Sequence, residues 1–180
     1  MDQGSGRRRA RVDSLRRFSQ DSPTSLTPDT SDARRFLLLE RIATGDALPE
    51  LLASVVRFIE EQSPGMIGSI VLVDNGRIRT VVGDNLPAAY RQALVGLPIG
   101  PRAGSCGTAA FTGERVIAED VETSEFWVDY RHLVCPHGLR ACWSSPVRLP
   151  EKGVVGTFAM YYRDVRSPTP AEIRWIDEAT

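Results

Sequence analysis

The sequence of 180 residues lacks any long apolar run, and no apolar stretch near its beginning could serve as a secretion signal. A membrane-crossing helix needs about 20 mostly apolar residues, so we expect no membrane span in this stretch. Cysteine is scarce as well, because only Cys106, Cys135 and Cys142 are present and no two of them form a C-x-x-C pair. This usage favours a reducing compartment, and we expect a cytoplasmic protein.

Short enzyme signatures are also missing, including those of phosphate-binding loops, serine hydrolases, zinc proteases and protein kinases. A formal net charge of −1 gives no basis for a nucleic-acid-binding surface over the whole chain. One pattern has the residue types of a metal site: His132, Cys135, His137 and Cys142. Pro136 stiffens its middle, and Cys142 falls within a predicted strand, so we expect no metal site.

Residues 1–31 are rich in Arg, Ser and Pro and have few large apolar side chains. Such a segment cannot bury enough apolar surface to offset the loss of chain entropy, so we expect a disordered tail. Its arginines leave open a contact with nucleic acid or an anionic membrane. A solvated tail is the simpler interpretation, and we expect no nucleic-acid partner.

Hydrophobic spacing predicts regular elements through the rest of the chain. Apolar residues at i, i+3 and i+4 predict a helix that begins near Leu48. The branched runs 66–73 and 77–82 predict a hairpin around Asn75 and Gly76, because Asn-Gly accepts positive φ. Four other helices are predicted at 33–44, 87–94, 106–111 and 125–134, and a last helix is predicted to begin at Pro170. The other predicted strands span 115–118, 141–149 and 154–163.

This order of elements predicts an α+β domain. We expect a mostly antiparallel sheet of five or six strands, with the terminal helices on one face and loops and short helices on the other. Ser105 is expected to cap the helix at 106–111, and Gly113 to end it. The last predicted helix carries no stop signal before Thr180, so we expect it to be truncated.

Two glycine-containing segments carry a resemblance to a known family. They are Gly104-Ser105-Cys106-Gly107-Thr108-Ala109-Ala110 and His137-Gly138-Leu139-Arg140-Ala141-Cys142-Trp143-Ser144-Ser145-Pro146-Val147. With the strands that follow them, they closely resemble a GAF domain, a small-molecule-sensing or regulatory module, over residues 33–180. The resemblance implies a GAF domain at residues 32–180, with ligands between the sheet and a cover at about residues 87–137. Similar versions of these motifs occur beside PAS, histidine-kinase or cyclic-di-GMP-metabolising modules of bacterial signalling proteins.

A pocket lined by aromatic residues is expected beneath this cover. The candidate aromatic residues are Phe126, Trp127, Tyr130, Trp143, Phe158 and Tyr161. Arg140 and Asp120 would supply polar groups, and Cys106 lies in the first turn of a predicted helix, where a thiol pKa is lowered. The three strand aromatics have an alternative interpretation as core, and Cys106 as a small buried residue. Trp127 lies on a polar, loop-flanked segment and has less reason to be core.

A more distant resemblance is to free methionine-R-sulfoxide reductase, a single GAF domain with a similar Cys-Gly-Thr-Ala-Ala segment, which here is residues 106–110. It implies that Cys135, eleven residues before Pro146, is the reacting thiol, and that a sulfenic acid and then a disulfide form. This sequence has no cysteine before Cys106, and Cys142 stands where that family has an acidic residue. A thiol enzyme using Cys135 and Cys106 is therefore the alternative function.

We expect a regulatory domain and not an enzyme on its own. It would bind an unknown small molecule, or receive a redox or conformational signal, and act on an output module through its terminal helices. No cofactor is expected: the cysteine position of bilin-binding relatives is Asp129-Tyr130 here, and no motif selects a cyclic nucleotide. The apolar faces of residues 48–59 and 173–176 are expected to pair in a homodimer, and a GAF scaffold that only dimerises is a third possibility.

Overall fold

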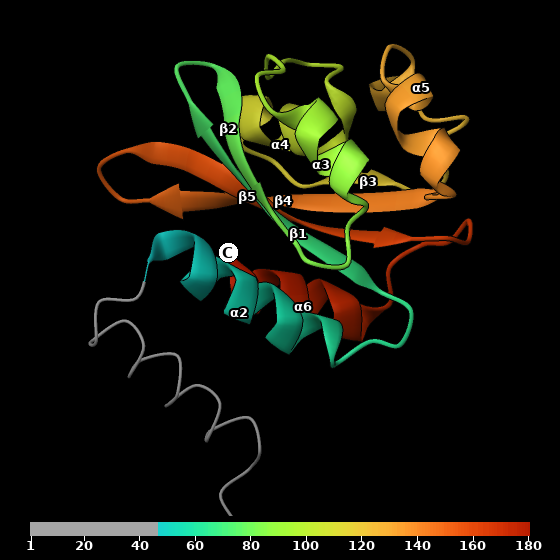
Figure 1. Cartoon of the computed structure of the whole chain (residues 1–180), viewed down its shortest axis with the longest axis horizontal. Coiled ribbons are helices and arrows are strands. Elements are labelled where there is room, and N and C mark those ends of the chain that lie inside the picture. Colours follow the sequence, from blue (N-terminus) through green and yellow to red (C-terminus); the bar gives the residue numbers. More distant parts are fainter. Residues whose placement is uncertain (1–46) are drawn as a thin grey trace, which may run out of the picture. The chain divides into compact units, whose positions relative to one another are not determined.

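The structure, a computed structural model, describes residues 47–180. Five strands form one sheet in the order β2-β1-β5-β4-β3, and each neighbouring pair is antiparallel (Figure 1). The strands are β1 (Ile67–Asp74), β2 (Arg77–Val82), β3 (Val116–Ala118), β4 (Ala141–Leu149) and β5 (Gly153–Tyr162). The predicted α+β, mostly antiparallel architecture is confirmed. The predicted tail at 1–31 and helix at 33–44 lie outside the described residues.

The β1–β2 hairpin forms where the sequence predicts it. Asn75 has a φ of 48° and Gly76 a φ of 72°, so both turn residues adopt the positive φ that an Asn-Gly pair tolerates. Arg77 pairs with Asp74 directly across this turn. The turn therefore sets the register that places Ile78 on the same face of the sheet as Val71.

Two helices pack side by side on one face of the sheet, here called the helix face (Figure 1). They are α2 (Leu48–Glu60) and α6 (Pro170–Ala179), so the predicted placement of the terminal helices on one face is confirmed. Leu48, expected within the buried stripe of α2, is 55% exposed, and burial along α2 is deepest at Val56 and Ile59. The buried cluster on this face comprises Val56, Ile59, Met66, Ile70, Ala141, Trp143, Phe158, Met160, Tyr162 and Ile176.

The opposite face, here called the cover face, lies beneath several short elements (Figure 1). They are α3 (Ala88–Leu94), α4 (Gly104–Thr112), η2 (Glu125–Trp127), α5 (Arg131–Val134) and η3 (Cys135–His137). Their inward side chains share a second buried cluster with strand residues of the other parity, among them Val71, Cys142, Ala159 and Tyr161. The domain is thus three layers deep, with the sheet in the middle.

Two helix predictions on the cover face are wrong in detail. The predicted helix at 125–134 is divided into η2 and α5, because Tyr130 has φ −121° and ψ 0°, outside the helical region. Ser105 is not a cap, since α4 begins at Gly104 and no side chain caps Ala103. Gly113 does end α4, with a φ of 72°.

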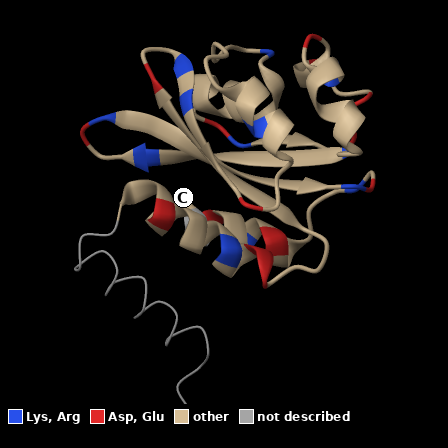
Figure 2. Ribbon diagram, in the orientation of Figure 1, with Lys and Arg blue, Asp and Glu red and all other residues tan. Residues whose placement is uncertain are grey.

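Charged residues lie mainly at turns, at strand ends and on helices, including α2 and α6 (Figure 2). The whole of β5 is uncharged, and β1 carries only Asp74 at its end. Both strands are therefore suited to burial on two faces. Within residues 47–180, no helix has both the length and the apolar character needed to cross a membrane.

Candidate functional site

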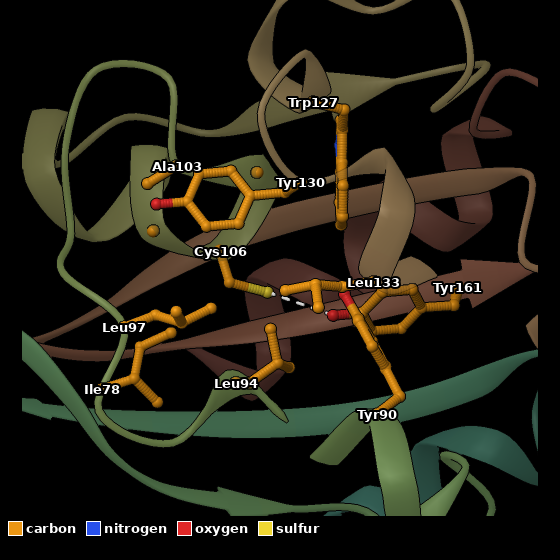
Figure 3. A pocket seen from close by; sticks show the side chains of 12 residues that line it. Ile78, Tyr90, Leu94, Leu97, Ala103, Cys106, Trp127, Tyr130, Leu133 and Tyr161 are labelled. Carbon is orange, nitrogen blue, oxygen red and sulfur yellow. Dashed lines mark hydrogen bonds between the residues drawn. The ribbon is translucent and has the colours of Figure 1, made fainter. Parts of the chain in front are cut away.

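A small cavity lies between the sheet and the cover (Figure 3). Side chains from the sheet, the cover helices and the loops between them line it: Ile78, Tyr90, Leu94, Leu97, Ala103, Gly104, Cys106, Gly107, Trp127, Tyr130, Leu133 and Tyr161. Its volume is about 10 Å³, close to what one water molecule needs. A larger occupant would require the cover to move outward.

Trp127 forms one wall of the cavity and is held by a buried hydrogen-bond chain. Its indole Nε1–H donates to Ser105 Oγ at 3.0 Å, and that hydroxyl donates to the Cys142 carbonyl at 2.9 Å. The chain joins η2, α4 and β4. Trp127 is 2% exposed, so its polar sequence context does not keep it at the surface. Glycine is favoured at position 104 because the residue has a φ of +64°, whereas a Cβ there would only come into ordinary van der Waals contact with the indole, at 3.4 Å.

Cys106 lies beneath Trp127 and is 5% exposed. Its Sγ is 3.4 Å from the Tyr161 hydroxyl, as the dashed line in Figure 3 marks. Interaction with the Cys142 thiol, followed by the Tyr161 hydroxyl, lowers the pKa of Cys106 to about 7, although burial acts in the opposite direction. Burial raises the pKa of Cys142 well above its usual value, so Cys106 is the first of the two thiols to ionise.

Two buried tyrosines complete the polar part of the cavity. The Tyr90 and Tyr161 hydroxyls both point toward the Cys106 sulfur (Figure 3), and their rings meet edge to face with centroids 5.9 Å apart. Burial raises the pKa of both phenols well above the usual value, so both stay protonated. Within the described residues, the Tyr90 hydroxyl is buried and has no hydrogen-bond partner.

Arg140 and Asp120 were predicted as polar groups of the pocket, but they do not line the cavity. The Arg140 guanidinium contacts both carboxylate oxygens of Asp120 at 3.1 Å and Glu122 Oε2 at 3.3 Å. The hydrogen bonds to Asp120 raise the pKa of Arg140. Val121 N also donates to the Arg140 carbonyl at 2.7 Å, so the pair fixes the loop after β3 against the start of β4.

Trp143 and Phe158 were grouped with the pocket aromatics, but both lie on the helix face and are fully buried there. The reason is the two-residue period of a strand. Phe158 and Tyr161 are three positions apart on β5 and therefore face opposite sides of the sheet. Phe126 packs against the cover cluster without lining the cavity, whereas Trp127 and Tyr130 line it together with Cys106.

Cys135 also stands apart from the cavity lining. It begins η3 and is partly exposed, and burial followed by the charge of Glu122 raises its pKa. A thiol with a raised pKa is a weaker nucleophile at neutral pH than Cys106 would be. Across residues 47–180, no group of three His, Cys, Asp or Glu side chains is placed to hold a metal ion.

Eight of the twelve lining residues were not among the predicted pocket residues. Tyr90 and Leu94 are two of these eight, and they lie one turn apart on the helix predicted at 87–94. Their spacing of four residues on one helix of the predicted cover could have indicated that both side chains face the pocket. Leu97, in a loop, and Leu133, in the four-residue helix α5, gave no such signal, because their placement depends on contacts between distant segments.

A second buried polar centre lies on the helix face, around Glu172 of α6. This carboxylate is 3% exposed and accepts hydrogen bonds from the Tyr162 hydroxyl at 2.6 Å, from Ser63 at 3.2 Å and from Arg166 at 2.9 Å. It also accepts from the Thr169 backbone N–H at 2.8 Å, which completes a capping box. Glu172 therefore joins the start of α6 to the end of β5.

Comparison with known proteins agrees with this architecture. The chain is 35% identical over 141 residues to the methyl sulfide methyltransferase-associated sensor of Methanosarcina acetivorans, an alignment that covers 77% of this chain and 14% of that protein. The chain therefore spans only about a seventh of that relative's length. A solved domain of a protein described as a two-component sensor histidine kinase from Sinorhizobium meliloti superposes with a TM-score of 0.60, at 22% identity over 76% of this chain and 88% of that one.

Free methionine-R-sulfoxide reductase from Neisseria meningitidis, solved with its substrate, superposes with a TM-score of 0.61, at 17% identity over 84% of this chain and 86% of that chain. At these identities the two solved structures show a shared fold. The sequence model of the GAF domain family matches residues 45–180, which include all of the described residues. With the five-stranded antiparallel sheet, its paired helices and its cover, this match shows that the chain belongs to the GAF domain family.

Proposed function

We propose that this chain is a regulatory, sensory GAF domain that binds a small molecule in the cavity under the cover. The observation that carries the proposal is the cavity itself, in which buried polar groups of Tyr90, Cys106 and Tyr161 converge among apolar walls. A concave apolar site with a few convergent polar groups is the usual form of a small-ligand site. The similarity to part of a sensor protein adds support.

Strand β5 supplies the connection from the cavity to the terminal helices. Tyr161 lines the cavity, and the next residue, Tyr162, donates to Glu172 of α6 on the helix face. An occupant that displaces Tyr161 along β5 would therefore also displace Tyr162. Because the Tyr162–Glu172 hydrogen bond is short and buried, α6 would respond to cavity occupancy.

The partners follow from this arrangement. We propose that α6 leads to an output module such as a histidine kinase or a cyclic-di-GMP enzyme, and that the domain acts in the cytoplasm. The apolar faces of α2 and α6 that were predicted to pair in a homodimer pack on the chain's own sheet, where Val56, Ile59 and Ile176 are buried. Homodimerisation would therefore use the outer surfaces of α2 and α6, where Leu48 is 55% exposed. Sedimentation at micromolar concentration tests the dimer, and a monomer there would count against it.

Native mass spectrometry of the purified chain tests ligand binding. The expected result is an excess mass that departs on unfolding. Leu94→Phe enlarges a 7%-exposed wall residue of the cavity and should abolish the excess mass. Leu149→Phe makes the same change at a side chain that is 46% exposed and should retain it. A bare mass in the unaltered chain, or equal excess in both variants, would contradict binding at this site.

A second candidate function is a thiol reductase of free methionine sulfoxide. The lowered pKa of Cys106 favours it, while the raised pKa of Cys135 disfavours the thiol that the resemblance implies as reactive. Thiol-dependent turnover of the free sulfoxide, measured beside Cys135→Ser and Cys106→Ser, decides between the two. Turnover by the unaltered chain that is lost in Cys135→Ser would establish the reductase activity. No turnover by the unaltered chain would leave the sensory function as the better account.

A further inference from the structure

Below about pH 7, where the Cys106 thiol is mainly protonated, the walls of the cavity are uncharged. None of the twelve lining residues, all within the described part of the chain, is acidic, basic or histidine. The ring centroid of His137 lies 5.8 Å from that of Tyr90, and His137 does not line the cavity. While Cys106 is protonated, an ion entering this space would lose its hydration and meet no counter-charge, and the aromatic faces would offset only part of that cost for a cation.

Charges just outside the cavity do not change this conclusion. Arg140 is paired with Asp120 and Glu122, so its guanidinium is already committed. The start of α4 does reach the lining through Gly104 and Cys106. A helix terminus carries only a partial positive charge, however, and its attraction for an anion is smaller than the cost of burying one.

One polar group in the cavity lacks a partner. The Tyr90 hydroxyl is buried and points toward the centre of the lining (Figure 3). It makes no hydrogen bond of normal geometry with any described residue, although the neighbouring Tyr161 hydroxyl acts to lower its pKa. Leaving a buried donor unpaired is unfavourable, and a ligand that accepts its proton would remove that cost. Four aromatic rings, those of Tyr90, Trp127, Tyr130 and Tyr161, surround the same space.

We propose that the ligand of this domain is a small, uncharged, largely apolar molecule with one hydrogen-bond acceptor that pairs with the Tyr90 hydroxyl. The proposal rests on the sensory function above and specifies the chemistry of that same site. It excludes ligands whose recognition depends on a carboxylate, a phosphate or an ammonium group inside the cavity.

Four probes of similar size separate charge from hydrogen bonding: benzyl alcohol, toluene, benzoate and benzylammonium. Binding is followed by NMR through the indole N–H signal of Trp127, which lines the cavity. At about pH 6, where the Cys106 thiol is mainly protonated, benzyl alcohol is expected to bind at least about tenfold more tightly than either ion, because the ions lose hydration without a counter-charge. Tyr90→Phe should weaken benzyl alcohol by about two- to tenfold and leave toluene within about twofold.

Three results would overturn the proposal: benzoate or benzylammonium binding as tightly as benzyl alcohol, an unchanged Trp127 signal with benzyl alcohol up to its solubility, or an equal effect of Tyr90→Phe on toluene. The outcomes also separate the proposal from the sensory function. A co-purified ligand identified as an ion would contradict the proposed ligand class but would still support a sensory function. Probe binding that leaves α6 unaffected would support the ligand class and count against sensing.

Discussion

Trp127 and Trp143 show how a single hydrogen bond distinguishes two buried tryptophans. Both are at most 2% exposed, and they lie on opposite faces of the sheet. The Trp127 indole donates to Ser105, whereas the Trp143 indole N–H has no partner among the described residues. Trp143 is held instead by stacking on Tyr162, with ring centroids 4.9 Å apart. Ser105 therefore holds Trp127, and with it the η2 segment of the cover, against β4.

Ser105→Ala should destabilise the domain by about 1–3 kcal/mol, because it leaves both the Trp127 indole N–H and the Cys142 carbonyl without this buried partner. Urea denaturation followed by tryptophan fluorescence measures the free energy of unfolding. The exposed Thr123→Ala serves as the control and should change stability by less than about 0.5 kcal/mol. Equal effects of the two substitutions would contradict the proposed role of Ser105.

The ionisation of Cys106 gives a second test at the residue scale. Thiolate absorbance should show one group ionising at a pH of about 7, and this step should vanish in Cys106→Ser and persist in Cys135→Ser. The folded pKa lies below the unfolded value of about 8.5, so the native state releases this proton first. The ionisation of Cys106 therefore stabilises the native state fully above about pH 8.5, and this stabilisation is lost as the pH falls through about 7. A single step near pH 8.5 in all variants would contradict this assignment.

At the scale of elements, α6 depends on one carboxylate for both its start and its docking. Glu172 accepts from Thr169 at the helix N-terminus, from Tyr162 of β5 and from Arg166, whose guanidinium lies 4.2 Å from the Tyr162 ring centroid. Burial tends to raise the pKa of Glu172, but the hydrogen bonds from Tyr162 and Thr169 and the charge of Arg166 outweigh it and lower the pKa.

Glu172→Gln keeps a capping side chain but removes the charge that faces Arg166, so it should destabilise α6 by about 1–3 kcal/mol at pH 7. Because the folded pKa of Glu172 is below its unfolded value, the carboxylate stabilises the fold above about pH 4.5, and this stability is lost as the pH falls through the folded value. The fluorescence of Trp175, on α6, should therefore show that α6 detaches from the sheet at acid pH in the unaltered chain. The same signal should depend less on pH in Glu172→Gln. An identical acid transition in both chains would rule out this role.

Local patterns predict most of the elements, and they fail where long-range packing decides. The Asn75-Gly76 turn and the start of α6 at Pro170 were predicted correctly, because each has a local conformational cause. The predicted helix at 125–134 is broken at Tyr130, which packs against the cover cluster. The side of the sheet reached by Trp143 could have been predicted, since the strand period fixes it once one neighbour is placed.

At the scale of the whole domain, one sheet, whose strand β5 is uncharged, separates two sites of different character. The cover face holds a small cavity of about 10 Å³, and the helix face holds the Glu172 network. Strand β5 contributes consecutive tyrosines to both. Because protein interiors are densely packed, a ligand larger than one water cannot enter without shifting the cover or β5. The central claim is that such a shift reaches α6.

Hydrogen–deuterium exchange of α6 in a chain with a filled cavity tests this claim most directly. Leu94→Phe adds volume inside the cavity, and Leu149→Phe adds the same volume at a partly exposed position. Leu94→Phe should change the rate of amide exchange by about threefold or more, both in the cover and in residues 170–179. A threefold change corresponds to roughly 0.7 kcal/mol in the free energy of local opening. Leu149→Phe should leave the exchange rates of both regions unchanged. Altered exchange in the cover of Leu94→Phe, with exchange of α6 identical to that of the unaltered chain, would contradict the claim.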